Sequence, residues 1–354
     1  MKSWYPLIPS VLLATSCLCT TSCSNEPGRT TSVKQALAAS SPVSTTLSWG
    51  TAPNQVGFKP AGPEQLAQGV SSVAVDSKGR VLLLDRLNGR VLRWNGSETQ
   101  VVAMVPADFE DLVCGPDEGI VTYSPLRHEV RMEGSGGRAS MHVPLTLRHV
   151  TGILSGPSRR VWLQTALQER FLLGSPSAPL SLAALLRTKA EGAWSLPEGR
   201  AVLVTVGWHG ASIQVVARNT GITAQRAGAR TYRIVKRIEL TEWNQTIARG
   251  GRLGITIVGT DGTVVCMRAD TVTQPRKRIQ IRRRLVCIDV ASTERVMDQD
   301  LGSVGLYAPR RDIAVGAGRV AFILPTRDGL RVTVWPLSSQ DVSNAATDTK
   351  GGAS

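Results

Sequence analysis

The chain is poor in histidine and in aromatic side chains: only 4 of its 354 residues are His, and 5% are aromatic. Zinc sites draw on His and on closely spaced Cys pairs, and no C-x-x-C spacing occurs beyond the N-terminal region. The sequence therefore predicts no metal site. Single-stranded nucleic acids are bound on aromatic stacking platforms, which these scattered aromatic residues do not supply.

Signatures of common catalytic sites are missing as well. The sequence contains no nucleophile elbow, no Gly-rich phosphate loop and no HExxH stretch. After the first residues, no apolar run is long enough for a transmembrane helix. These absences favour a protein without chemistry of its own, so we predict no catalytic residue and no cofactor.

The first 23 residues indicate export. Residues 4–14 form an apolar stretch too short to span a bilayer, and three Cys follow at positions 17, 19 and 23. Leu13-Ala-Thr-Ser-Cys17 resembles the lipobox of bacterial lipoproteins, which are cut before a Cys that becomes lipidated. Cys23, after Thr20-Thr-Ser, is a second candidate for lipidation, and an ordinary cleaved secretory signal is the alternative. On either reading the domain is exported, and the lipidated form is expected in the bacterial cell envelope, on the periplasmic face of the outer membrane or at the cell surface.

The net charge is +14, from 41 basic and 27 acidic residues. Such a charge favours a nucleic-acid partner in the cytosol, whereas an exported protein meets proteins, anionic lipids and acidic glycans. We therefore expect a protein or an anionic envelope ligand and no nucleic acid. The densest basic cluster, residues 276–284, is either an electrostatic contact for such a partner or the solvated tip of a hairpin.

The region around residues 69–94 organises the rest of the chain. Val73–Val75, Arg80–Leu84 and Arg90–Trp94 read as short strands, separated by turns that end at Gly79 and Gly89. The strands are apolar on both faces, so each side needs a covering layer. Three such strands cannot be stable alone, which predicts that the unit is repeated.

Copies of this unit recur at a spacing near forty residues. The turns at Gly79, Gly119, Arg159 and Gly199 are each forty residues apart, and the interval then stretches to Gly262 and Gly318. A short strand candidate precedes each turn: Val73–Val75, Leu112–Cys114, Gly152–Leu154, Ala193–Ser195, Ile255–Val258 and Ile313–Val315. Six small antiparallel sheets at this period predict an all-β fold, a six-bladed β-propeller, with a β-sandwich as the alternative.

The first unit also resembles a known repeat. Val73-Ala-Val-Asp76, Gly79-Arg-Val81, Asp85 and Asn88-Gly-Arg-Val91 are similar to the NHL repeat, the blade of a family of mostly six-bladed propellers. The resemblance is specific over residues 69–94 only. It implies the fold and leaves activity open, because the family includes binding platforms as well as enzymes.

The sequence divides into four regions. We expect a lipoprotein signal region at 1–23, a flexible tether at 24–44, the propeller at 45–337 and a disordered tail at 338–354. The last unit supplies one strand fewer than a full blade. Thr45–Trp49 is the free strand candidate at the other end, so we predict that it completes that blade and closes the ring.

Two cysteines are predicted to form a disulfide. If Arg276-Lys277 is a two-residue hairpin tip, Pro275 lies opposite Arg278. Antiparallel partners keep a constant sum of residue numbers, and Cys266 and Cys287 share that sum. An exported protein meets oxidising conditions, in which two facing thiols join.

The candidate binding site is the face from which the chain enters the innermost strands. Charged side chains lie at these entry points: Arg148, His149, Arg252, Arg310, Arg311, Glu110 and Asp111. We expect this Arg-rich set to bind a partner, because Arg offers a planar fork to carboxylates and phosphates. The alternative is that the charges pair with one another. Rim charges add little stability, so reversing Arg310 and Arg311 is expected to leave the fold intact.

Together these observations predict a lipid-anchored envelope propeller that acts as a non-catalytic binding or scaffold module. The alternative is a metal-dependent hydrolase or lyase, like the lactonases and esterases known on six-bladed propellers. That activity needs several carboxylate, Asn or His side chains converging on the channel mouth.

Lipid attachment can be tested directly. The wild-type protein should incorporate a clickable fatty acid during growth, because the lipobox-like segment presents a Cys for acylation. Gel fluorescence should show this label and its loss in a Cys17→Ser/Cys23→Ser double variant. A double variant that still carries the label would contradict the assignment.

Overall fold

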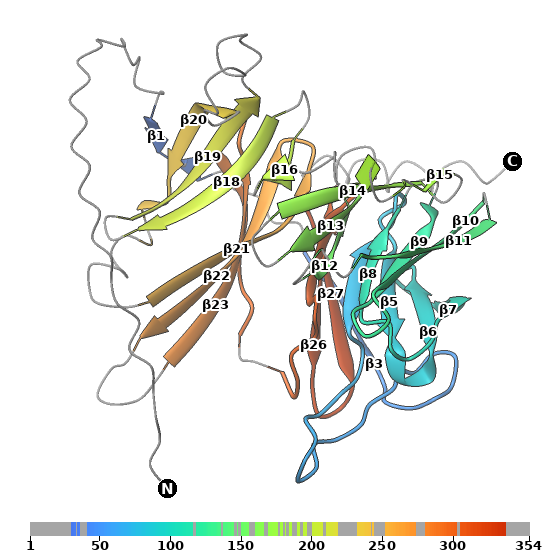
Figure 1. The fold of residues 1–354 in the computed structure, drawn as a ribbon. Helices are drawn as coiled ribbons and strands as arrows, with labels where there is room; N and C mark the ends of the chain where they lie inside the picture. The colour runs from blue at the N-terminus through green and yellow to red at the C-terminus, as the bar shows by residue number, and fades with distance from the viewer. Residues whose placement is uncertain are drawn as a thin grey trace, which may run out of the picture.

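Antiparallel β-strands form nearly all of the regular structure (Figure 1). The computed structural model describes residues 30–32, 34–35 and 41–337, except positions 116–117, 136, 145–146, 148–149, 156–159, 166–168, 176–177, 180, 182–183, 186–189, 192–193, 197–199, 208–209, 219–231, 242, 244–251, 274–279 and 303–304. Its strands group into six sheets, which are the six blades of a β-propeller. The predicted fold class is therefore confirmed.

Three blades come from the two ends of the propeller region. Blade 1 consists of β4 (Ser72–Val75), β5 (Val81–Asp85), β6 (Arg90–Trp94) and β7 (Thr99–Met104), with a 3-10 turn, η1 (Arg86–Asn88), between β5 and β6. Blade 2 consists of β8 (Asp111–Cys114), β9 (Ile120–Ser124), β10 (Glu129–Gly134) and β11 (Gly137–His142). Blade 6 consists of β25 (Ile313–Gly316), β26 (Arg319–Pro325), β27 (Leu330–Pro336) and β3 (Val43–Leu47).

The middle of the chain forms the other three. Blade 3 consists of β12 (Val150–Ser155), β13 (Val161–Thr165), β14 (Glu169–Ser175), β15 (Ala178–Pro179) and β16 (Ala190–Glu191). Blade 4 consists of β17 (Trp194–Ser195), β18 (Arg200–Gly207), β19 (Gly210–Arg218), β20 (Tyr232–Glu239) and β1 (Thr30–Ser32). Blade 5 consists of β21 (Arg252–Asp261), β22 (Val264–Thr273), β23 (Gln280–Asp289), β24 (Glu294–Asp300) and β2 (Lys34–Gln35).

The apolar core lies between successive blades. One buried cluster joins blades 6 and 1, and others join blades 1 and 2, 2 and 3, 4 and 5, and 5 and 6. The innermost strands contact each other around the axis, β25 with β4, β4 with β8, and β8 with β12. This layering explains why Val81–Leu84 is apolar on both faces: all four side chains are buried. Because the blade is repeated around the ring, neighbouring blades cover both faces of this sheet and bury its apolar side chains.

The first turn shows how the sequence sets the blade. Asp76 accepts hydrogen bonds from the backbone N–H groups of Lys78 and Arg80, at 2.9 Å each, and one from Arg80 Nε at 2.7 Å. Gly79 has φ +74°, in the left-handed region that favours glycine. The acidic first residue and the closing glycine therefore define the reversal between β4 and β5.

The ring closes by a strand from the N-terminal side. β3 pairs antiparallel with β27, with Leu47 opposite Leu330 and Val43 opposite Val334. Blade 6 thus combines strands from both ends of the domain, as the sequence predicts. The strand begins at Val43 and ends at Leu47, two residues earlier than Thr45–Trp49. Trp49 instead forms an isolated bridge with Val56.

Part of the predicted tether is paired with the propeller. β1 adds in parallel to β20 of blade 4, and β2 adds in parallel to β24 of blade 5. The low content of large apolar residues predicts a flexible tether at 24–44. Strand addition at a blade edge uses backbone groups, which composition does not reveal.

Cys266 and Cys287 lie opposite each other in the β22–β23 ladder, in the register derived from the hairpin arithmetic. A disulfide joins them, and both residues are fully buried where blade 5 packs on blade 6. The hairpin tip assumed in that arithmetic lies outside the described residues. The lipidation candidates Cys17 and Cys23 and the predicted tail at 338–354 lie outside them too.

The contribution of β3 can be measured by substitution. Leu47 is buried in the cluster between blades 6 and 1, whereas its neighbour Thr46 is exposed. Leu47→Ala should lower the free energy of unfolding by about 2–5 kcal/mol, because it leaves a cavity under the closing strand. Thr46→Ala is the control and should change it by less than about 0.5 kcal/mol. Equal urea midpoints for the two variants would argue against closure through β3.

Candidate functional site

The innermost strands surround a channel cavity of about 140 Å³. Its wall is mainly small apolar side chains and glycine, and one charged side chain, Arg311, reaches it. We call the face where the innermost strands begin the entry face. No carboxylate occurs among the described residues that line the cavity. Within the described ranges, no group of three His, Cys, Asp or Glu side chains is placed to hold a metal ion.

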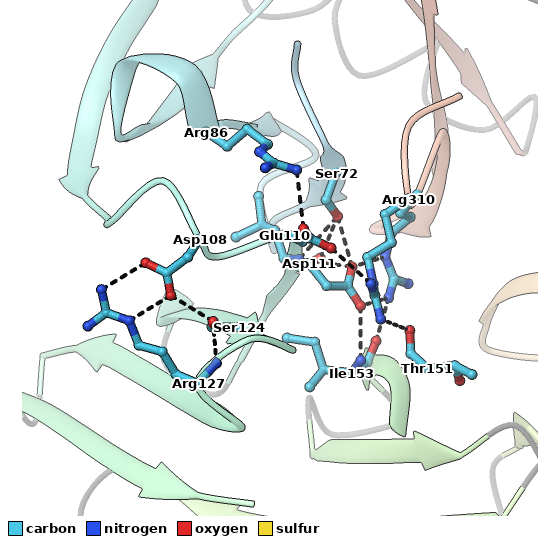
Figure 2. Close-up of polar contacts among 12 residues, drawn as sticks. Ser72, Arg86, Asp108, Glu110, Asp111, Ser124, Arg127, Thr151, Ile153 and Arg310 are labelled. Carbon is cyan, nitrogen blue, oxygen red and sulfur yellow. Dashed lines mark hydrogen bonds and ion pairs between the residues drawn. The ribbon is translucent and has the colours of Figure 1, made fainter. Parts of the chain in front are cut away.

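Asp111, the first residue of β8, is the centre of the entry-face network (Figure 2). Its Oδ1 accepts hydrogen bonds from Ser72 Oγ at 2.9 Å and from Arg311 Nε at 3.0 Å. Its Oδ2 accepts from the Ile153 N–H and from Arg311 Nη2, both at 2.9 Å. One carboxylate therefore links blades 1, 2 and 3 to the segment that enters blade 6.

The surroundings of Asp111 favour its ionised form. Burial by itself raises the pKa of this carboxyl, since only 1% of the residue is exposed. The charge and hydrogen bonds of Arg311, the Ile153 N–H and the charge of Arg310 outweigh burial and lower the pKa below its ordinary value. Arg311 also donates to the Ile153 carbonyl. We call this hydrogen-bonded Asp111–Arg311 ion pair at the channel mouth the strut.

Arg310 and Glu110 form a second, shallower pair beside it. Glu110 Oε2 accepts from Arg310 Nη1 at 3.1 Å, and Glu110 Oε1 accepts from Arg86 Nη1 at 3.2 Å. Arg310 also donates to the Thr151 carbonyl and lies over the Tyr123 ring. Between a quarter and a third of each of the Arg86, Glu110 and Arg310 side chains is exposed. Two arginines thus flank one carboxylate, which leaves a net charge of +1 at the surface.

The structure therefore brings four of the predicted residues together: Glu110, Asp111, Arg310 and Arg311. Arg148 and His149 lie outside the described residues, and of Arg252 only its place at the start of β21 is described. The expectation that Arg311 is a dispensable rim charge does not agree with this geometry. Its side chain is only 17% exposed and pairs with a buried carboxylate, so its reversal would set two negative charges together.

The basic cluster at 276–284 is largely neutralised where it is described. Arg282 pairs with Asp300, Arg283 with Asp312, and Arg284 with Asp298. Asp312 also accepts from Arg268 at 3.2 Å. Acidic residues distant in sequence but adjacent across the strands thus balance the positive run.

A shallow cleft lies next to the strut on the entry face, with a volume of about 180 Å³. Its wall includes Ser71, Arg86, Glu110, Tyr307 and Arg310. Arg86 and Tyr307 are not among the residues predicted from the sequence, because they come from two separate connections. The signal that could have found Tyr307 is its position three residues before Arg310, in the segment that enters β25.

The long connection between β3 and β4 shapes one wall of this cleft. Buried Asp85 accepts from the Gly57 N–H at 3.0 Å and from Arg90 Nε at 3.1 Å. Arg90 in turn donates to the carbonyls of Ala52 and Gln55, which fixes the connection to blade 1. The rings of Trp49, Phe58 and Tyr307 stack in sequence across it.

Comparison with known proteins shows similarity of fold without similarity of sequence. No family model matches the chain, and no curated protein matches it by sequence. Virginiamycin B lyase from Staphylococcus aureus is 8% identical, with 75% of this chain and 94% of that one covered and a TM-score of 0.39. BamB from Moraxella catarrhalis is 12% identical, covering 81% and 90%, with a TM-score of 0.34.

A third similar structure is the PQQ-bound aldose sugar dehydrogenase from Streptomyces coelicolor. It is 10% identical, with 84% of this chain and 98% of that one covered and a TM-score of 0.42. Enzymes therefore occur among the similar structures, and at these identities the likeness concerns the fold alone. Separately, no helix in the described part of the chain is long and apolar enough to cross a membrane.

The two neighbouring arginines should differ in their effect on stability. Arg311→Gln leaves a buried carboxylate without its cation, which should cost about 3–5 kcal/mol of unfolding free energy. Arg310→Gln removes a partly exposed pair and should cost about 1 kcal/mol or less. Urea unfolding of both variants measures the difference. Equal losses of unfolding free energy in the two variants would show that Arg311 does not stabilise the buried Asp111 carboxylate.

Proposed function

We propose that the chain is an exported, lipid-anchored binding module that holds a protein partner on the entry face of its propeller and has no chemistry of its own. The observation that carries the proposal is where exposed apolar side chains lie. Adjacent strands of a blade alternate in direction, so the entry face collects the strand ends and connections on the side where β4, β8 and β25 begin.

Six of the nine exposed large hydrophobic side chains in the described part of the chain belong to that face. They are Leu66, Met104, Leu126, Val206, Ile281 and Leu306. Leu66 and Leu126 are 85% and 80% exposed, in the connections before β4 and between β9 and β10. Exposed apolar patches mark protein-interaction surfaces, so the side with most of the exposed apolar side chains is the better candidate for a protein contact.

The charges of this face support a protein partner over a polyanion. Arg282 to Arg284 are each paired with an Asp, and Arg311 is committed to Asp111. A polyanion would need several cations without partners, whereas a protein interface combines apolar side chains with a few fixed Arg groups. The entry face has that combination.

Site-specific photo-crosslinking in the native cells tests the proposal. A benzophenone amino acid at position 66 or 126 should form an adduct with the same partner protein, because both positions lie on the binding face. Positions 43 and 235 serve as controls: Val43 is exposed at the opposite end of blade 6, and Val235 is exposed on the outer strand β20. Adducts of equal yield at all four positions, or none at 66 and 126, would reject the entry face as the binding surface.

A further inference from the structure

Residues that line the entry-face cleft carry donor groups that have no partner among the described residues. A guanidinium group has five N–H donors. The described contacts of Arg86 use one of its nitrogens, Nη1, which donates to Glu110, and the buried Nε has no partner among the described residues. Ser71 Oγ, in a residue 93% buried, is likewise without a described partner. An N–H group of Arg can only donate, so a group bound beside it must be an acceptor.

Tyr307 adds a further donor to the same wall. Burial raises the pKa of its hydroxyl above the ordinary value, so the hydroxyl keeps its proton throughout the neutral range. The ring approaches the backbone at Gly69 so closely that a side chain there would collide with the hydroxyl. The absence of a side chain at position 69 therefore leaves room for the Tyr307 hydroxyl beside the cleft.

The charge of the cleft selects the type of acceptor. Arg86 and Arg310 flank Glu110, so the lining has a net charge of +1 (Figure 2). A carboxylate neutralises this charge. A phosphate group, with close to two negative charges, would place more negative charge beside Glu110. The volume of about 180 Å³ exceeds what one water needs and accommodates a carboxylate with its attached carbons.

We propose that this cleft binds a carboxylate of the protein partner, from an acidic side chain or a chain terminus, next to an apolar residue. The apolar requirement follows from Leu66 and Leu306, both exposed and each adjacent in sequence to a residue that lines the cleft. The proposal rests on the proposed function, because it names what the partner presents to the entry face. Arg86 is the main donor, and Glu110 competes with the ligand for it.

Ligand-observed saturation-transfer NMR on the detergent-solubilised full-length chain tests this with N-acetyl-leucine as the probe. N-acetyl-leucinamide is the matched neutral control, because it differs only at the carboxylate. The acid should bind saturably and the amide should not. Equal binding of acid and amide, no binding of the acid, or tighter binding of methyl phosphate would overturn the proposal.

Variants make the test specific to the cleft. Arg86→Gln should weaken binding of the acid by about tenfold or more, as expected for loss of a charge-assisted hydrogen bond. Arg127→Gln is the matched control: Arg127 lies on the same face but pairs with Asp108, outside the cleft, and its loss should not change the affinity. Glu110→Gln should tighten binding, since it removes the competing carboxylate, a gain that a merely structural role does not produce. If Arg86→Gln does not fold, Tyr307→Phe must weaken binding for the proposal to stand.

The outcomes separate this proposal from the proposed function. Crosslinks at positions 66 and 126 without binding of N-acetyl-leucine would reject the carboxylate subsite and leave the protein-binding face standing. Binding of the acid without crosslinks would reject the protein-binding face and show that the cleft takes small carboxylates.

Discussion

The buried carboxylate of Asp111 is the contact on which the channel mouth depends. A charge with 1% exposure is tolerated only where hydrogen bonds and an opposite charge replace water, and its partners come from blades 1 and 3 and from the entry to blade 6. These partners are far apart in sequence, and they are brought together by the closed ring of blades. The ion pair therefore joins the entry segments of four blades.

Much of the architecture could be predicted from the sequence because a propeller repeats one local unit, two antiparallel strands joined by a turn. The turn at Asp76–Gly79 uses a side-chain cap and a left-handed glycine, and its spacing recurs near forty residues, so six strand pairs could be placed before any tertiary contact was known. The register of Cys266 against Cys287 followed from a hairpin rule, and the missing strand of the last blade pointed to the N-terminal side. The strands β1 and β2 could not be predicted in this way. They pair with β20 and β24 through backbone groups, and the composition of this segment indicated only a tether.

The candidate site was accessible from sequence only in part. The rule that entry segments converge brought Glu110, Asp111, Arg310 and Arg311 into one group, as observed. It could not distinguish the buried arginine from the surface one, because adjacent residues in an irregular segment have no periodicity from which burial can be read. Nor could it find Arg86 or Tyr307, since the cleft is formed where four connections of unrelated sequence meet.

The difference between the two arginines is also what makes a binding role physically reasonable. Arg311 is mostly buried and paired with Asp111, so its side chain stabilises the contact between blades and is not available to a partner. Arg310 and Arg86 share one carboxylate between them at the surface, which holds both guanidinium groups in place while leaving donor capacity on Arg86. Groups that are ordered before binding lose less conformational entropy when a partner arrives. The buried Asp111–Arg311 pair and the partly paired Arg86 above it are thus the features on which the proposed anion-binding role of the entry face depends.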